Sequence, residues 1–120
     1  MIGSWLSGLE QPYNCVSADE DTIYAKTDVY NGSTIVGSNR IAKYIFNSTS
    51  LTWGRASYST LALGGSLAYD GVYLYSFDYF SYVSGGTVHT IRCRIINPDT
   101  YNVIATTYIT KTGAVSGEIS

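Results

Sequence analysis

The chain repeats itself with an offset of fifty residues. Residues 18–60 align with residues 68–110 without a gap, and seven positions are identical. The identical pairs are Ala18/Ala68, Asp28/Asp78, Ile41/Ile91, Ile45/Ile95, Asn47/Asn97, Tyr58/Tyr108 and Thr60/Thr110. Strand-like runs and turns coincide too, because DTIYA lies over GVYLY and FNSTSLTW lies over INPDTYNV. A fixed period of this length indicates two copies of one supersecondary unit.

Each copy contains four short runs with the composition of β-strands. The expected strands are 13–18, 22–27, 40–46 and 51–57 in the first copy, and 62–69, 72–77, 87–96 and 101–108 in the second. Asp70-Gly71 lies between alternating apolar residues, which is a strong hairpin signal, and Asn97-Pro-Asp-Thr is good turn chemistry. Two longer polar loops are expected, Asp28 to Asn39 and Asp78 to Gly86.

These patterns predict an all-β fold of two four-stranded antiparallel sheets that resemble propeller blades. We expect one domain over residues 1–120. Its parts are a lead-in with a partial strand (1–11), a first repeat (12–60), a second repeat (61–110) and the start of a further blade or a closing strand (111–120). A single β-sandwich of about eight strands is the alternative.

The composition suits one small globular domain. Of the 120 residues, 45% are hydrophobic and 13% charged, and 12 are Tyr, which favours strands over helices. No apolar run approaches the roughly 18 residues that cross a bilayer, and no signal peptide is visible at the N-terminus. The net charge of −2 and the scattered Lys and Arg argue against a nucleic-acid partner and against membrane insertion.

The YDGVYLY hairpin followed by INPDTYNVIAT resembles the blades of the surface-layer YVTN and kelch-type β-propellers, and residues 42–53 resemble the second half of a kelch blade. The resemblance covers about residues 13–110, concerns the architecture, and brings no catalytic residues with it. Two features differ. Kelch blades carry a Gly-Gly pair where this chain has Thr27-Asp28 and Phe77-Asp78. A propeller ring also needs at least about four blades, whereas this chain has two blade-like repeats.

Both alternating sets of side chains on the expected strands are apolar. Ile41 and Ile45 lie on one face of their strand and Tyr44 and Phe46 on the other. Two such sheets can cover only one face of each other, so aromatic side chains would remain exposed. We therefore predict that the chain self-associates or packs against neighbouring subunits, as a closed ring of two-bladed protomers or end to end in a larger particle.

The sequence carries no specific catalytic or metal-binding signature, so neither an enzyme nor a cofactor or metal site is expected. His89 alternates with Ile91 and Cys93 on an expected interior strand, which favours a packed or interface histidine over a general base. The acidic run Asp19 to Asp21 favours a solvated turn over a calcium site, because the spacing of a calcium loop is missing. Cys15 and Cys93 are expected to be free thiols.

The two polar loops are the expected ligand-binding surface. Tyrosine rings, carboxylates and amides are the groups that recognise sugars, and in a propeller both loops would share one rim. The candidate ligand-binding residues are Asp28, Tyr30, Asn31, Asp78, Tyr79 and Tyr82. Asn31 and Asn47 begin acceptor sequons for N-glycosylation.

Two functions from different classes follow. The first is a non-catalytic structural and interaction protein, a propeller-like subunit of a surface or virion assembly. The alternative is a lectin-like adhesion module that binds a glycan and oligomerises into a full propeller. Either function predicts an extracellular, cell-surface or virion location.

Overall fold

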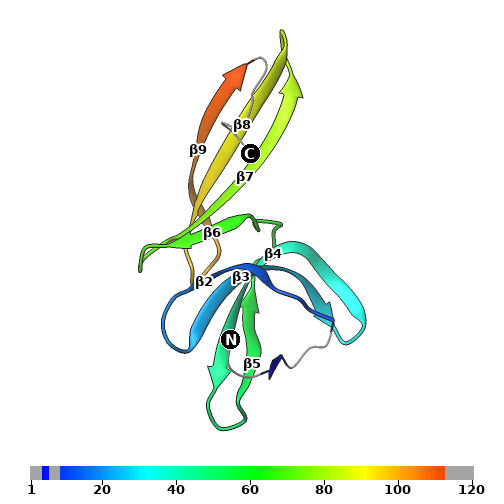
Figure 1. The fold of residues 1–120 in the computed structure, drawn as a ribbon, viewed down its shortest axis with the longest axis vertical. Helices are drawn as coiled ribbons and strands as arrows, with labels where there is room; N and C mark the ends of the chain where they lie inside the picture. The colour runs from blue at the N-terminus through cyan, green and yellow to red at the C-terminus, as the bar shows by residue number, and fades with distance from the viewer. Residues whose placement is uncertain (1–3, 6–8, 113–120) are drawn as a thin grey trace.

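The computed structural model describes residues 4–5 and 9–112, which form strands joined by turns and loops and contain no helix (Figure 1). The strands make two sheets, each with four antiparallel strands, which confirms the predicted fold class. The structure is elongated, with extents of 57 × 32 × 25 Å.

The first sheet has the strand order β1-β5-β4-β3-β2. Its strands are β1 (Ser4–Trp5), β2 (Tyr13–Ser17), β3 (Thr22–Asn31), β4 (Thr34–Asn47) and β5 (Thr52–Tyr58). The two-residue β1 runs parallel to β5 and brings Trp5 opposite Trp53, so the lead-in extends the first sheet. The remaining pairs are antiparallel hairpins between neighbours in sequence.

The second sheet has the order β6-β7-β8-β9 and is antiparallel throughout. Its strands are β6 (Ser66–Tyr69), β7 (Leu74–Val83), β8 (Thr87–Ile96) and β9 (Val103–Thr112). Of the tail expected to begin a further blade (111–120), Lys111 and Thr112 complete β9, and the rest lies outside the described residues.

The prediction of two long loops was wrong, because both segments are extended hairpins. Strands β3 and β4 leave only residues 32–33 between them, and β7 and β8 leave only residues 84–86. Gly32 (φ 63°), Gly85 (φ 66°) and Gly86 (φ 127°) supply the left-handed backbone that such tight turns need. The hairpin ends are solvated on both faces, so their strands lack the alternation of polar and apolar residues that marks a strand in a sequence.

The fifty-residue period is visible in the pairing of the last two strands of each sheet. Three cross-strand pairs recur fifty positions later: Ala42–Tyr58 as Arg92–Tyr108, Lys43–Ser57 as Cys93–Thr107, and Phe46–Trp53 as Ile96–Val103. The period does not extend to the preceding hairpin. Ile41 pairs with Lys26, whereas Ile91 pairs with Tyr79 and not with Ser76. Asp28 and Asp78 therefore do not occupy equivalent positions, although the sequences align there.

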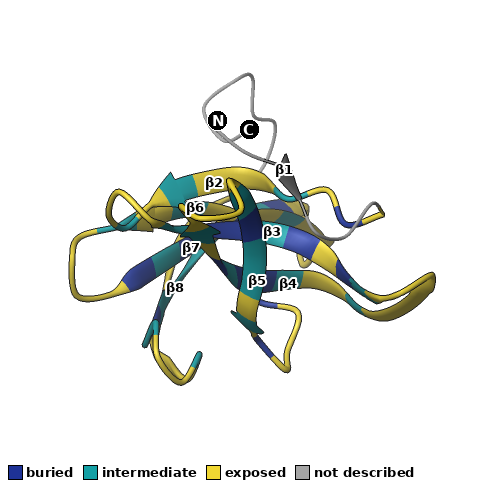
Figure 2. Cartoon of the chain, turned by 90° about the horizontal axis from the view of Figure 1, so that it is seen from below, coloured by how far each residue is buried: buried dark blue, intermediate teal, exposed yellow. Residues whose placement is uncertain are grey.

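The two sheets share a core where β6 packs against β2 and β3. Five buried side chains form its centre: Tyr24, Ile41, Leu63, Leu74 and Ile96. Burying side chains of this size stabilises a fold by roughly 1.5–3 kcal/mol each. Polar contacts support the junction, since the Tyr101 and Ser57 hydroxyls lie 2.7 Å apart and Ser76 Oγ donates to the carbonyl of Leu63 at 2.6 Å. Seen from below, buried positions lie where the strands cross and the turns are exposed (Figure 2).

The opposite face of the first sheet has a second core. Ala25, Ala42, Tyr44 and Trp53 are buried there, and the Phe46 and Trp53 rings lie 5.2 Å apart. The first sheet thus buries apolar side chains on both faces. The second sheet does not, and its β7–β9 ends project beyond the first sheet (Figure 1).

Candidate functional site

The six candidate ligand-binding residues lie on strands and not in loops. Asp28, Tyr30 and Asn31 belong to β3, and Asp78, Tyr79 and Tyr82 belong to β7. The β3–β4 and β7–β8 hairpins extend in different directions, so the expected common rim does not form (Figure 1). The carboxylates already have partners: Asp28 Oδ1 accepts the backbone N–H of Asn39 at 3.1 Å, and Asp78 binds two arginines.

The two faces of the second sheet differ in what covers them. Leu74 and Ile96 pair across β7 and β8 and enter the shared core, so their face is the inner face. The alternate residues make the outer face. Its apolar and aromatic members are Tyr75, Phe77 and Tyr79 on β7, Ile91, Cys93 and Ile95 on β8, and Ala105 and Ile109 on β9.

None of these outer-face residues is buried. Phe77 is 41% exposed, Tyr79 45% and Ile109 66%. The central members Ile91 and Ile95 are half-buried by their neighbours within the sheet. Apolar and aromatic residues predominate on this face over three long strands, although Ser81, Thr107 and Lys111 share it. An exposed apolar surface of this extent is unusual for a face that stays in water.

The repeat explains why this face is apolar. Ile41 on β4 points into the core between the sheets, and its counterpart fifty residues later, Ile91 on β8, lies on the outer face. Three pairs between β8 and β9 repeat pairs between β4 and β5, so the outer face corresponds to the face of the first sheet that packs against the second. The second copy presents the same kind of surface with no third sheet to cover it in the described chain.

His89 lies near the far end of the outer face. Its Nδ1 is 2.5 Å from the hydroxyl of Tyr79, and the two rings are stacked with centroids 6.0 Å apart. Sequence reasoning anticipated a packed or interface histidine, and the structure places His89 beside the exposed tyrosine. Its ring therefore forms part of the outer face.

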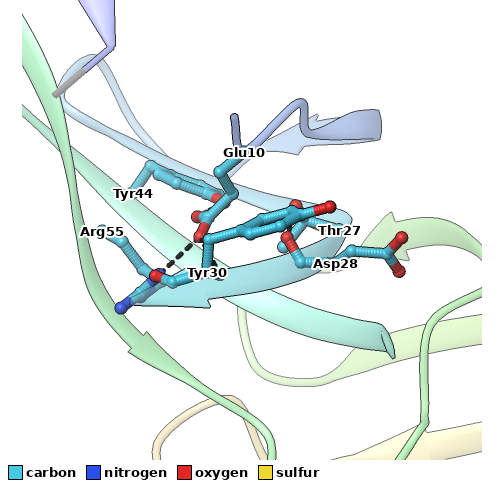
Figure 3. A network of polar contacts seen from close by, with 6 residues as sticks. All are labelled: Glu10, Thr27, Asp28, Tyr30, Tyr44 and Arg55. Atoms are coloured by element: carbon cyan, nitrogen blue, oxygen red, sulfur yellow. Dashed lines mark hydrogen bonds and ion pairs between the residues drawn. The ribbon is translucent and has the colours of Figure 1, made fainter. Parts of the chain in front are cut away.

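A buried carboxylate, Glu10, ties the lead-in to the first sheet (Figure 3). Its Oε1 accepts the backbone N–H of Tyr30 at 3.0 Å and pairs with Arg55 Nη1 at 2.5 Å, and the Tyr44 hydroxyl donates to its Oε2. Burial, followed by the hydrogen bond to Glu10, raises the pKa of Tyr44. Every polar atom named here has its partner within the chain, so this network is structural. Sequence analysis did not identify it, because Glu10 stands alone in its segment.

A second charged cluster lies on the inner face of the second sheet. Arg92 binds Asp78 through two hydrogen bonds, Nε to Oδ1 at 3.0 Å and Nη2 to Oδ2 at 2.5 Å. Arg94 Nη2 lies 3.6 Å from the same Oδ2. The hydrogen bonds from Arg92 lower the pKa of Asp78, so its carboxylate stays ionised at neutral pH. Of the six candidate residues, Asp78 enters a charged cluster through its side chain, and Tyr30 contacts the Glu10 network through its backbone.

The cysteines, the acidic turn and the sequon asparagines singled out in the sequence do not form a binding site in the described residues. Cys15 and Cys93 are free, and Asp19 Oδ1 accepts the N–H of Asp21 at 2.8 Å within the acidic turn. Within residues 4–5 and 9–112, no group of three or more His, Cys, Asp or Glu side chains is placed to hold a metal ion. The sequon residues Asn31 and Asn47 end their strands and are exposed.

No helix long and apolar enough to cross a membrane occurs in the described part of the chain. Comparisons with protein-family models, with curated proteins and with solved structures find no match for this chain.

Proposed function

We propose that this chain is a non-catalytic structural subunit that assembles with other copies of itself through the outer face of its second sheet. The observation that carries the proposal is the exposure of Phe77, Tyr79 and Ile109 on a face whose centre is Ile91 and Ile95. Covering apolar surface stabilises an assembly by roughly 25 cal/mol per Å². This face carries few ionisable groups, so little charge opposes contact with a second apolar sheet.

The outer face is large enough for a specific contact. Three strands of ten residues, spaced about 4.8 Å apart with a rise of about 3.3 Å per residue, span about 500 Å² of sheet face. Two copies in contact would bury about 1,000 Å², which is near the lower limit for specific interfaces. The exposed aromatic rings are the residue type that interfaces enrich.

The equivalence of the two units supports a propeller-like arrangement. One face of the first sheet already packs against the second sheet, and the outer face is its counterpart. A sheet from another copy would meet the outer face in the same manner, which adds blade-like units in a ring or along a larger surface or virion assembly. An extracellular, cell-surface or virion setting belongs to this proposal.

The lectin-like alternative receives no support from the placement of its six residues. Asp78 and Tyr82 lie on the inner face of the second sheet and Tyr79 lies on its outer face, whereas the first sheet carries Asp28, Tyr30 and Asn31. Sugar recognition at a shared rim needs these groups side by side. The two hairpins therefore do not form a shared sugar-binding rim.

Light scattering tests the proposal. The wild-type chain should have a solution mass that is a multiple of 13.1 kDa, with three copies giving a six-bladed ring. Phe77→Lys and Ile109→Lys should each reduce it toward the monomer, because a charge would be buried without a partner. Leu61→Lys is the matched control, since Leu61 is 63% exposed but lies between the sheets in sequence and off the outer face. A monomeric wild type, or both face variants assembling as the control does, would refute the proposal.

A further inference from the structure

The charges of the inner-face cluster do not balance. Arg92 engages both oxygens of Asp78, and Arg94 approaches only the oxygen that Arg92 Nη2 already holds. Two guanidinium groups therefore share one carboxylate. Lys26 on the first sheet adds a third positive charge near enough to help lower the pKa of Asp78.

Arg94 is the least satisfied of these cations. Its side chain is 15% exposed, and its Nε has no hydrogen-bond partner and almost no contact with solvent. Burial, with a smaller effect from Arg92, lowers the pKa of Arg94. A buried cation with an N–H that lacks an acceptor is unfavourable, and an anion bound beside the guanidinium would offset its charge.

Aromatic and hydroxyl groups surround the two arginines on the same face. The Arg92 guanidinium lies 5.3 Å from the centre of the Phe80 ring, and Tyr108 is the cross-strand partner of Arg92 and is 58% exposed. Thr90 continues the row on β8, and its hydroxyl is buried without a hydrogen-bond partner. The cluster therefore offers a ring surface beside its cationic groups.

We propose that Arg92 and Arg94 form a binding site for one oxyanion, a carboxylate, sulfate or phosphate group, which binds the Arg94 guanidinium and shares Arg92 with Asp78. Guanidinium groups bind such anions through two parallel hydrogen bonds, and the contact of Arg94 Nη2 with Asp78, at 3.6 Å, is longer than a hydrogen bond. The anion can come as a free inorganic ion or as the acidic group of a saccharide whose ring contacts Tyr108. This site is independent of the outer face, because the two lie on opposite faces of the sheet.

Isothermal titration at constant ionic strength tests the site with two probes, inorganic sulfate and a sulfated oligosaccharide, and a neutral oligosaccharide is the blank. Millimolar sulfate should bind the wild type, and Arg94→Gln should weaken binding roughly tenfold or more, since charge-assisted hydrogen bonds are lost. Lys43→Gln is the control. It removes one positive charge from β4 of the first sheet and should leave the sulfate affinity within about twofold of the wild type. Asp78→Asn should tighten binding, because it removes the competing carboxylate.

Arg94→Lys resolves the case in which Arg94→Gln fails to fold. It keeps the positive charge but loses the planar guanidinium group with its parallel N–H donors. It should therefore weaken sulfate binding while the far-UV circular dichroism spectrum stays that of the wild type. Tighter binding of the sulfated oligosaccharide than of sulfate, lost on Tyr108→Ala, would identify the saccharide source, and equal binding would identify the inorganic ion. No sulfate binding by the wild type, or equal binding by the wild type and a folded Arg94 variant, would overturn the site. Neither outcome bears on self-association, which is measured by mass.

Discussion

Asn47 and Asn97, fifty residues apart, hold the same turn in the same way. Asn47 Oδ1 accepts the backbone N–H groups of Thr49 and Ser50, at 2.9 and 3.2 Å, and Asn97 Oδ1 accepts those of Asp99 and Thr100, at 2.8 and 3.3 Å. In both turns the residue four positions after the asparagine has a positive φ, 58° at Leu51 and 62° at Tyr101. The two hairpins are therefore copies of one turn, although only the asparagine is identical between them.

Replacing either asparagine should destabilise the chain. Asn47→Ala and Asn97→Ala each remove an acceptor of two backbone hydrogen bonds, and we expect each to lower the free energy of unfolding by about 1 kcal/mol. Urea denaturation measures this difference. Asn102→Ala is the control, because only the backbone of Asn102 takes part in the turn. Equal midpoints for Asn97→Ala and the control would show that the side-chain bonds contribute nothing.

The positive φ of Leu51 predicts a stabilising substitution. Leu51 is 56% exposed, so little packing is lost when its side chain is removed. Glycine adopts this backbone without the steric cost that a side chain brings, and Leu51→Gly should raise the free energy of unfolding by about 0.5 kcal/mol. The similarly exposed Leu61, which has no positive φ, should respond in the opposite direction to Leu61→Gly. A lower melting temperature for Leu51→Gly would contradict this account.

Glu10 should be important for the stability of the first sheet. Its carboxylate is buried and serves Arg55, Tyr44 and the backbone of Tyr30, so Glu10→Gln leaves a cation without its partner. We expect a loss of about 2 kcal/mol, less than for a fully buried pair because Arg55 is 27% exposed. Chemical denaturation of Glu10→Gln beside Glu20→Gln, an exposed glutamate in a turn, is the measurement. The prediction fails if the two variants unfold at the same denaturant concentration.

Alkaline pH should destabilise the fold through buried tyrosines. Burial, with smaller contributions from Tyr101 and other nearby groups, raises the pKa of Tyr24 from its ordinary value of 10.0 to about 12. The neutral form is thus favoured in the folded state, and its stabilisation is complete below pH 10.0 and lost as the pH rises towards 12. Within this window the unfolding free energy should fall by up to about 1.4 kcal/mol per pH unit for one such tyrosine, because unfolding then releases about one proton.

Tyr24→Phe provides the check on that slope. Unfolding free energies measured between pH 9 and pH 12 should fall less steeply for Tyr24→Phe than for the wild type. Tyr82→Phe is the control, since Tyr82 is 49% exposed and lies far from the shared core. Parallel pH profiles for the wild type and Tyr24→Phe would show that Tyr24 does not titrate with unfolding.

Local patterns in the sequence predicted the two sheets, the central part of most strands and the turns after Tyr69 and Ile96. Alternating apolar residues and turn residues such as Asn97 and Asp70 act over a few positions, so their effect can be read locally. The sequence also predicted that two sheets with apolar residues on both faces would leave aromatic side chains exposed, and Phe77 and Tyr79 are exposed.

The tertiary structure alone decided which face is covered and which charges meet. The register between β7 and β8 places Asp78 opposite Arg92 and puts Ile91 on the outer face. A shift of one residue would move every side chain of a strand to the other face, and no local pattern specifies that choice. Glu10 likewise meets Arg55 only because the lead-in folds back over the first sheet, across 45 positions of sequence. Contacts of that separation depend on the packing of the whole chain, which is why the sequence predicted the sheets but not the surfaces that they present.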